Sequence, residues 1–160
     1  MNELTDQFSI ADVITKDLIN LDLKAQNKED AIIELSQMLF DKGIINSVDD
    51  FSKDVFGREK EGMTGLGQGT AIPHGKSDSV VKTSLAIGRT NLPIKWESLD
   101  EKPVNIIILF AVRNTDANTV HIKLLQRVAM LLADEDFIHH LHTVESKDKM
   151  LELLSKEPTE

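Results

Sequence analysis

The sequence has no cysteine, no tyrosine and one tryptophan among its 160 residues. Without cysteine there can be no disulfide, no cysteine-ligated zinc and no thiol nucleophile, so any chemistry must use other side chains. An aromatic content of 4% leaves little material for stacking nucleic-acid bases. The longest apolar run, Ile106 to Val112, is far shorter than the roughly 20 residues that span a bilayer, and the first residues show no basic segment followed by an apolar one. We therefore expect a cytoplasmic protein that does not insert into a membrane.

Acidic residues outnumber basic ones by 27 to 18, which gives a formal net charge of −9. Such a chain is a poor electrostatic partner for nucleic acid or anionic lipid. The length is close to the roughly 150 residues of a typical domain, and no stretch rich in Pro, Gly or Ser divides the chain. We expect a single domain over residues 1–160, with a core at about 4–156.

Hydrophobic patterns predict both strands and helices. Residues 18–23 and 83–89 alternate apolar with polar or small side chains, as strands do, and the apolar run 104–112 is typical of a central strand covered on both faces. The glycine-rich segment 62–75 should contain no regular helix, and residues 91–103, with two prolines, should form a connection. Apolar residues at helical spacing predict helices at 27–43, 47–57, 118–133, 134–142 and 146–156. This order predicts an α/β protein, a three-layer α/β/α sandwich with a mixed central sheet.

The most distinctive local feature is the segment AIPHGKS at 71–77, which follows three alternate glycines at 65–69. Glycines so spaced permit positive φ angles, so that neighbouring amides can converge into an anion-binding concavity. Pro73 stiffens the backbone before His74, and Gly75 removes a side chain after it, which leaves the imidazole accessible to a phosphoryl-sized reactant. A neutral imidazole is nucleophilic, and its phosphoramidate is labile enough to pass the group on. The alternative is that His74 only caps a turn, and the glycines match neither the nucleotide nor the dinucleotide loop pattern.

Two further residues are candidates for binding an anion. His121 falls in the first turn of the helix expected at 118–133, where a neutral imidazole can donate a hydrogen bond to a phosphoryl oxygen beside free backbone amides. The alternative is an ordinary packing or surface histidine. Arg58 can fork onto phosphoryl oxygens or onto a carboxylate of a partner, although a solvated ion pair with Glu59 or Glu61 is the competing interpretation.

The histidines at 139, 140 and 142 raise the question of a metal site. Two of them lie three apart on an expected helix, but no carboxylate or fourth ligand completes a recognisable spacing. We interpret these histidines as partly exposed structural residues and predict no metal and no cofactor. Trp96 is interpreted as a packing residue.

Taken together, these residues resemble a known family, the IIA component of the bacterial sugar phosphotransferase system, fructose and mannitol class, with its nitrogen-type relatives. The resemblance covers the chain from about Leu4. The matching segments are RE at 58–59, GMTGLGQGTAIPHGK at 62–76, LD at 99–100, PV at 103–104, His121 with LL at 124–125, LAD at 132–134, Phe137 and Leu141.

The resemblance implies that His74 accepts a phosphoryl group from the phosphohistidine carrier HPr, as a tele-phosphohistidine, and donates it to a cysteine of a IIB component. IIB then phosphorylates sugar during uptake through the membrane component IIC. By the same resemblance His121 stabilises the phosphoryl group and Arg58 lies at the site. Further residues are expected at the phosphoryl-binding or partner-binding surface, namely Thr64, Gly65, Gly69, Gly75 and Lys76.

Details of the match favour the fructose branch, through Trp96, the LD pair at 99–100 and the PV pair at 103–104. The alternative is a nitrogen-type regulatory protein that binds its targets according to its phosphorylation state. Two positions depart from the family pattern: Met63 replaces a common small hydroxyl residue, and Thr70 replaces an aliphatic one. The charge of −9 leads us to expect an acidic surface around the phosphorylated histidine, attractive to a basic face of HPr.

Overall fold

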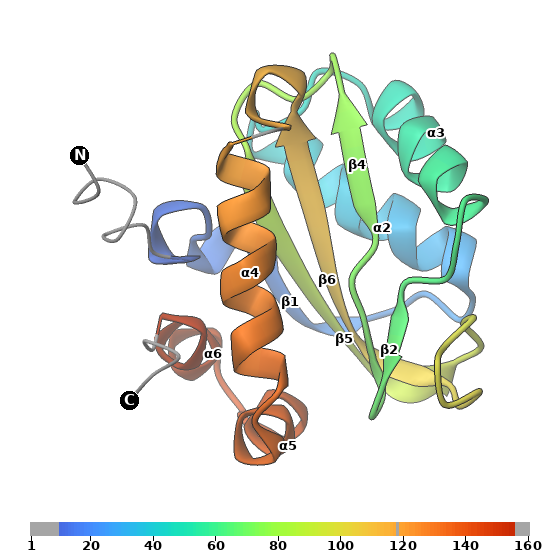
Figure 1. Ribbon diagram of the computed structural model, residues 1–160, viewed down its shortest axis with the longest axis vertical. Helices are drawn as coiled ribbons and strands as arrows, with labels where there is room; N and C mark the ends of the chain where they lie inside the picture. Colours follow the sequence, from blue (N-terminus) through green and yellow to red (C-terminus); the bar gives the residue numbers. More distant parts are fainter. Residues whose placement is uncertain (1–9, 118, 156–160) are drawn as a thin grey trace.

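The computed structural model describes residues 10–117 and 119–155, and the centre of this part is a mixed six-stranded sheet (Figure 1). The strand order is β1-β5-β6-β3-β2, and β4 pairs with β6 beyond the end of β3. The strands are β1 (Ile19–Leu23), β2 (Gly65–Gly67), β3 (Thr70–Ala71), β4 (His74–Ser77), β5 (Ser84–Ile94) and β6 (Val104–Arg113).

Helices cover both faces of this sheet. Strand β5 runs parallel to β1 and antiparallel to β6, whereas β3 and β4 run parallel to β6. Figure 1 shows α4 on the near face, α2 behind the strands and α3 beside β4. The helices are α2 (Lys28–Asp41), α3 (Val48–Glu59), α4 (Val120–Leu132), α5 (Glu135–Thr143) and α6 (Lys147–Leu154), with 3-10 turns at Ile10–Asp12, Lys16–Leu18 and Asn114–Asp116. The predicted α/β/α sandwich with a mixed sheet is confirmed.

The helices start where the sequence places polar caps. A side-chain oxygen accepts a hydrogen bond from a backbone amide of the first turn at four caps, Asn27 (α2), Ser47 (α3), Asp134 (α5) and Ser146 (α6). Each such bond satisfies a donor that the helix itself cannot pair. Helix α3 continues past Gly57 to Glu59, while the expected boundary residues 118 and 156 lie outside the described residues. Within the described residues, no helix has the length and apolar character needed to cross a membrane.

Strand β6 is the buried centre of the sheet, as predicted. All its residues from Ile106 to Val112 are buried, and helices or strands flank it on every side. Strand β5 is longer than expected, because it continues to Ile94, which pairs with Val104. The prediction that residues 91–103 form a connection was therefore wrong for residues 91–94, which belong to β5. Pro93 is accommodated because the register between Arg89 and Ile94 is irregular, so that no regular ladder hydrogen bond is required of it.

The glycine-rich segment forms a hairpin. Gly67, Gln68 and Gly69 have φ angles of 101°, 55° and 75° and make the turn between β2 and β3. The amide of Gln68 donates to Asp100 Oδ2 at 3.0 Å, and its carbonyl lies 3.0 Å from His142 Nε2. Positive φ is the conformation that glycine adopts without steric cost, so the glycines serve this turn.

Thr70, the first residue of β3, buries a hydroxyl without a hydrogen-bond partner in the described structure. Because an unpaired buried hydroxyl costs free energy, we expect Thr70→Val to raise the free energy of unfolding by about 1 kcal/mol. Thr83 is the matched control, since its buried hydroxyl donates to Asp116 and accepts from the Arg113 amide. Urea unfolding should show Thr83→Val less stable than wild type. Destabilisation by both substitutions would contradict this explanation.

Candidate active site

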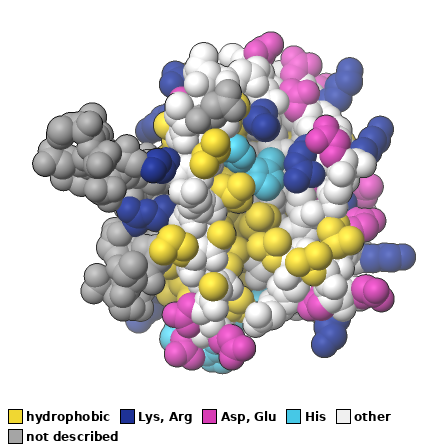
Figure 2. Space-filling view, viewed as in Figure 1, with side chains coloured by type: hydrophobic (Ala, Val, Ile, Leu, Met, Phe, Trp, Pro, Cys, Tyr) yellow, Lys and Arg dark blue, Asp and Glu magenta, His cyan; other side chains and the backbone are white. Residues whose placement is uncertain are grey.

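Two buried histidines from different layers meet at one end of the sheet. His74 begins β4, and His121 lies in the first turn of α4. Their ring centroids are 5.3 Å apart with an interplanar angle of 81°, and the residues are 6% and 8% exposed. Figure 2 shows histidine side chains gathered in the upper part of this face, between apolar side chains on one side and basic ones on the other. The structure thus brings together the two histidines that the sequence singled out.

Phe110 of β6 forms a wall beside His74. The parallel register pairs His74 with Phe110, and their rings stack at 4.7 Å with an interplanar angle of 26°. Nδ1 of His74 and of His121 are both buried without a hydrogen-bond partner among the described residues. Nδ1 of His74 is therefore closed to solvent.

Burial and neighbouring positive charge keep His74 neutral. Burial is the main cause, followed by His121, Arg58 and Lys76, and together they lower the pKa of His74 to about 3. Burial, followed by Lys76, also lowers the pKa of His121. At neutral pH, His74 consequently keeps the lone pair that a nucleophile requires, and His121 is a neutral hydrogen-bond donor.

The lowered pKa of His74 predicts acid sensitivity. An unfolded histidine takes up a proton near pH 6.5, whereas folded His74 does so only near pH 3, so stability is lost as pH falls below 6.5. We expect wild type to lose about 2 kcal/mol more free energy of unfolding than His74→Gln between pH 7 and pH 5. Urea unfolding at both pH values measures this difference. Equal losses in the two proteins would show that His74 is not held neutral by folding.

His74 opens on a cavity of about 560 Å³ next to α3. The charged lining residues are four cations and two carboxylates, Lys53, Arg58, Lys60, Lys76, Asp54 and Glu61. The expectation of an acidic surface around His74 was therefore wrong on this side, because the net charge of −9 lies elsewhere on the molecule. A basic lining suits a phosphoryl group, which brings negative charge to the histidine.

Residues 12–157 match the family model of the phosphoenolpyruvate-dependent sugar phosphotransferase system, EIIA 2. The chain belongs to this family. It is 31% identical over 147 residues to the fructose-specific EIIABC component of Bacillus subtilis (strain 168). The aligned region covers 92% of this chain but only 23% of that protein.

Solved structures of EIIA proteins share the fold. The nitrogen regulatory protein IIA-Ntr from Neisseria meningitidis aligns with a TM-score of 0.83 and 31% identity, over 91% of this chain and 98% of that one. Enzyme IIAMTL from Escherichia coli, in its complex with phosphorylated enzyme IIBMTL, aligns with a TM-score of 0.75 and 28% identity, over 88% of this chain and 96% of that one. The resemblance noted in the sequence is thus confirmed at the level of the family.

Arg58 and Lys76 of this EIIA chain line the His74 cavity. Arg58 Nη1 donates to the Gly62 carbonyl at 3.4 Å, and no ion pair joins it to Glu59 or Glu61, both of which are described residues. The guanidinium therefore keeps most of its donors for an anion. The geometry favours the anion-binding interpretation of Arg58 over the ion-pair alternative.

The expected glycine cradle does not form beside His74. Gly69 directly precedes Thr70, which pairs with Ile106 of β6. Ile106 lies four positions, or about 13 Å, along β6 from Phe110, which is the partner of His74. The amides of the hairpin turn therefore lie at a distance from the histidine and form no cradle around its ring. The cause is the parallel register of β3 and β4 on β6, which glycine spacing does not reveal.

Three other predicted residues, Thr64, Gly65 and Gly75, make contacts within the fold. A Cβ on Gly75 would lie 2.6 Å from Phe51 and 2.7 Å from Val55, so its absence lets α3 pack on β4. A Cβ on Gly65 would lie 2.6 Å from the Glu97 carbonyl oxygen. The Thr64 hydroxyl is buried and already bonded to Glu59 and Trp96. We therefore assign none of these three residues to direct phosphoryl contact, and their place at a partner-binding surface stays a prediction.

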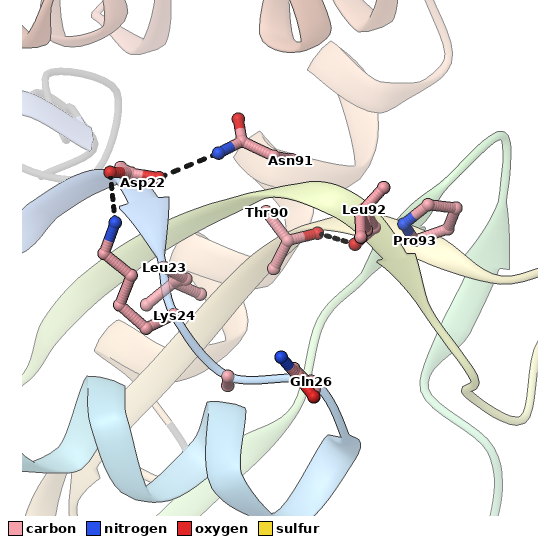
Figure 3. A pocket seen from close by; sticks show the side chains of 9 residues that line it. Asp22, Leu23, Lys24, Gln26, Thr90, Asn91, Leu92 and Pro93 are labelled. Carbon is pink, nitrogen blue, oxygen red and sulfur yellow. Dashed lines mark hydrogen bonds and ion pairs between the residues drawn. The ribbon is translucent and has the colours of Figure 1, made fainter.

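A second cavity, of about 400 Å³, lies at the other end of the sheet, where β1 ends and β5 becomes irregular (Figure 3). Asp22 there accepts hydrogen bonds from Lys24 at 2.7 Å and from Asn91 at 2.9 Å. The charged groups thus neutralise each other, and no histidine lines the space. This cavity lacks the nucleophile that the first one contains.

Proposed function

We propose that this chain carries a phosphoryl group on Nε2 of His74, which it takes from phospho-HPr and gives to a cysteine of a IIB component. The observation that carries the proposal is the buried, neutral His74, whose Nδ1 is enclosed and which opens on a basic cavity beside His121. Positioning and charge stabilisation are most of what phosphoryl transfer asks of a protein.

In the first step the Nε2 lone pair of His74 attacks phosphorus, and the bond from phosphorus to the HPr imidazole breaks. In the second step a IIB thiolate attacks phosphorus, and the bonding electron pair returns to Nε2. His121 donates a hydrogen bond to a phosphoryl oxygen, while Arg58 and Lys76 balance its charge. The Phe110 wall holds the imidazole ring in one orientation during both steps.

We further propose a fructose-type transport role for a single cytoplasmic domain, with IIC reached only through IIB. Its support is the sequence likeness to a fructose-specific protein and the structural likeness to an enzyme IIA bound to phosphorylated IIB. A regulatory role of the nitrogen type is the second candidate, since a nitrogen regulatory protein has the same fold at 31% identity.

Onward transfer distinguishes the two roles. The chain is first phosphorylated with radiolabelled phosphoenolpyruvate, enzyme I and HPr, and a purified fructose-specific IIB domain is then added. Transport predicts that the label moves to IIB within seconds. Label that stays on the chain with IIB present, while a nitrogen-regulation target binds only one phosphorylation state, would assign the regulatory role.

A further inference from the structure

Four side chains that include Glu59, the neighbour of Arg58 in the sequence, form one polar network. Trp96 Nε1 donates to Thr64 Oγ1 at 3.1 Å, and Thr64 Oγ1 donates to Glu59 Oε2 at 2.7 Å. Glu59 Oε1 lies 2.6 Å from Lys28 Nζ, as an ion pair rather than a directed hydrogen bond. Thr64 is 2% exposed and Trp96 4%, so water does not compete for the hydrogen bond between them.

The network connects four segments that are distant in the sequence. Lys28 begins α2, Glu59 ends α3, Thr64 precedes β2, and Trp96 lies between β5 and β6. Lys28 Nζ also lies 5.2 Å from the centroid of the Trp96 ring and 2.8 Å from Glu97 Oε1. Removal of the Thr64 hydroxyl therefore leaves two groups without this partner, Trp96 Nε1 and Glu59 Oε2.

The network fixes the end of α3, where the cavity begins. Glu59 directly follows Arg58, whose guanidinium lines the cavity with His74. Arg58 also bonds to the carbonyl of Gly62, in the same segment that Thr64 anchors. The two anchored points, Glu59 and Thr64, therefore determine where Arg58 lies relative to His74.

We propose that Lys28, Glu59, Thr64 and Trp96 are positioning residues that hold Arg58 in place for the phosphoryl group on His74. This inference rests on the proposed function. Because Thr64 and Trp96 are buried, their contacts set the rate of transfer within the complex and leave the affinity for the partner unchanged.

The matched pair Thr64→Val and Thr64→Ser tests the network. Serine keeps the hydroxyl, whereas valine leaves the Trp96 donor and the Glu59 carboxylate without it. Rapid-quench assays with phospho-HPr should show transfer at saturating HPr about tenfold slower for Thr64→Val, near wild type for Thr64→Ser, and an unchanged KM for both. Trp96, the single tryptophan, reports the state of the network, and its emission should shift in Thr64→Val only.

A double-mutant cycle tests whether the network acts through Arg58. In the Arg58→Ala background, Thr64→Val should slow transfer by less than about twofold, because the group it positions is already absent. A second tenfold loss there would overturn the proposal. Equal transfer rates for Thr64→Val and Thr64→Ser would also overturn the proposal, when the wild-type chain accepts the phosphoryl group normally.

Trp96→Phe replaces Thr64→Val in the same cycle if the valine protein does not fold, since it removes the Nε1 donor and keeps a ring. Transfer at the wild-type rate in folded Trp96→Phe would likewise overturn the proposal. A wild-type chain that takes no phosphoryl group from HPr defeats the proposed function itself, and this inference with it.

Discussion

His74→Ala is expected to take up no label from phosphoenolpyruvate, enzyme I and HPr, a loss of the full signal. The reason is that no other imidazole combines enclosure of Nδ1, a wall such as Phe110 and an opening onto the basic cavity among the described residues. His139→Ala is the control, because His139 is exposed and lies on α5 outside the site. The acid lability of the label should match that of a phosphoramidate.

His74→Gln guards against misfolding, since glutamine retains a polar side chain of similar length where alanine leaves a cavity beside Phe110. Circular dichroism should show both variants folded. Undiminished labelling of either variant would show that the phosphoryl group is carried elsewhere.

His121→Ala is expected to accept the phosphoryl group but to pass it to IIB about 100-fold more slowly, which is the usual effect of removing one transition-state hydrogen-bond donor. The ring of His121 lies 5.3 Å from that of His74, close enough for its proton to reach a phosphoryl oxygen between them. Single-turnover chase from the phosphorylated chain to IIB measures the rate. Onward transfer at the wild-type rate would remove this role from His121.

The local elements could be predicted from the sequence because their signals are local. Asn27 and Ser47 start helices through bonds to residues three positions later, and the apolar run at 104–112 needs no partner to show that it is buried. The hairpin at 65–69 could not be placed in the same way. Glycine indicates a positive φ angle, but the sheet register decides where that turn lies, and register depends on residues of β6 far along the chain.

The sequence predicted the two histidines of the candidate site but not the contacts that Phe110 and Thr64 make around it. His74 stands in a motif and His121 in the first turn of an expected helix, so the sequence indicated both, although 47 positions separate them. Phe110 carried no such signal, because an aromatic residue in an apolar strand is ordinary core. Thr64 lay in the motif, yet the role of its hydroxyl depends on Trp96, 32 positions later, and this contact forms only on folding.

Net charge is a property of the whole chain, and it did not predict the charge of the residues that line the His74 cavity. The −9 of the sequence is compatible with a cavity lined by more cations than carboxylates. An acidic protein can thus present a basic site to an anion, while its overall charge still disfavours nucleic acid.

The identity of the phosphorylated atom tests the central claim most directly. Nitrogen-15 and phosphorus-31 NMR of the chain, labelled at histidine and phosphorylated through HPr, distinguishes the two ring nitrogens of each histidine. Because Nδ1 of His74 is enclosed, the account predicts one phosphoryl group, on Nε2 of His74. A phosphoryl group on Nδ1 of His74, or on any other histidine, would contradict it.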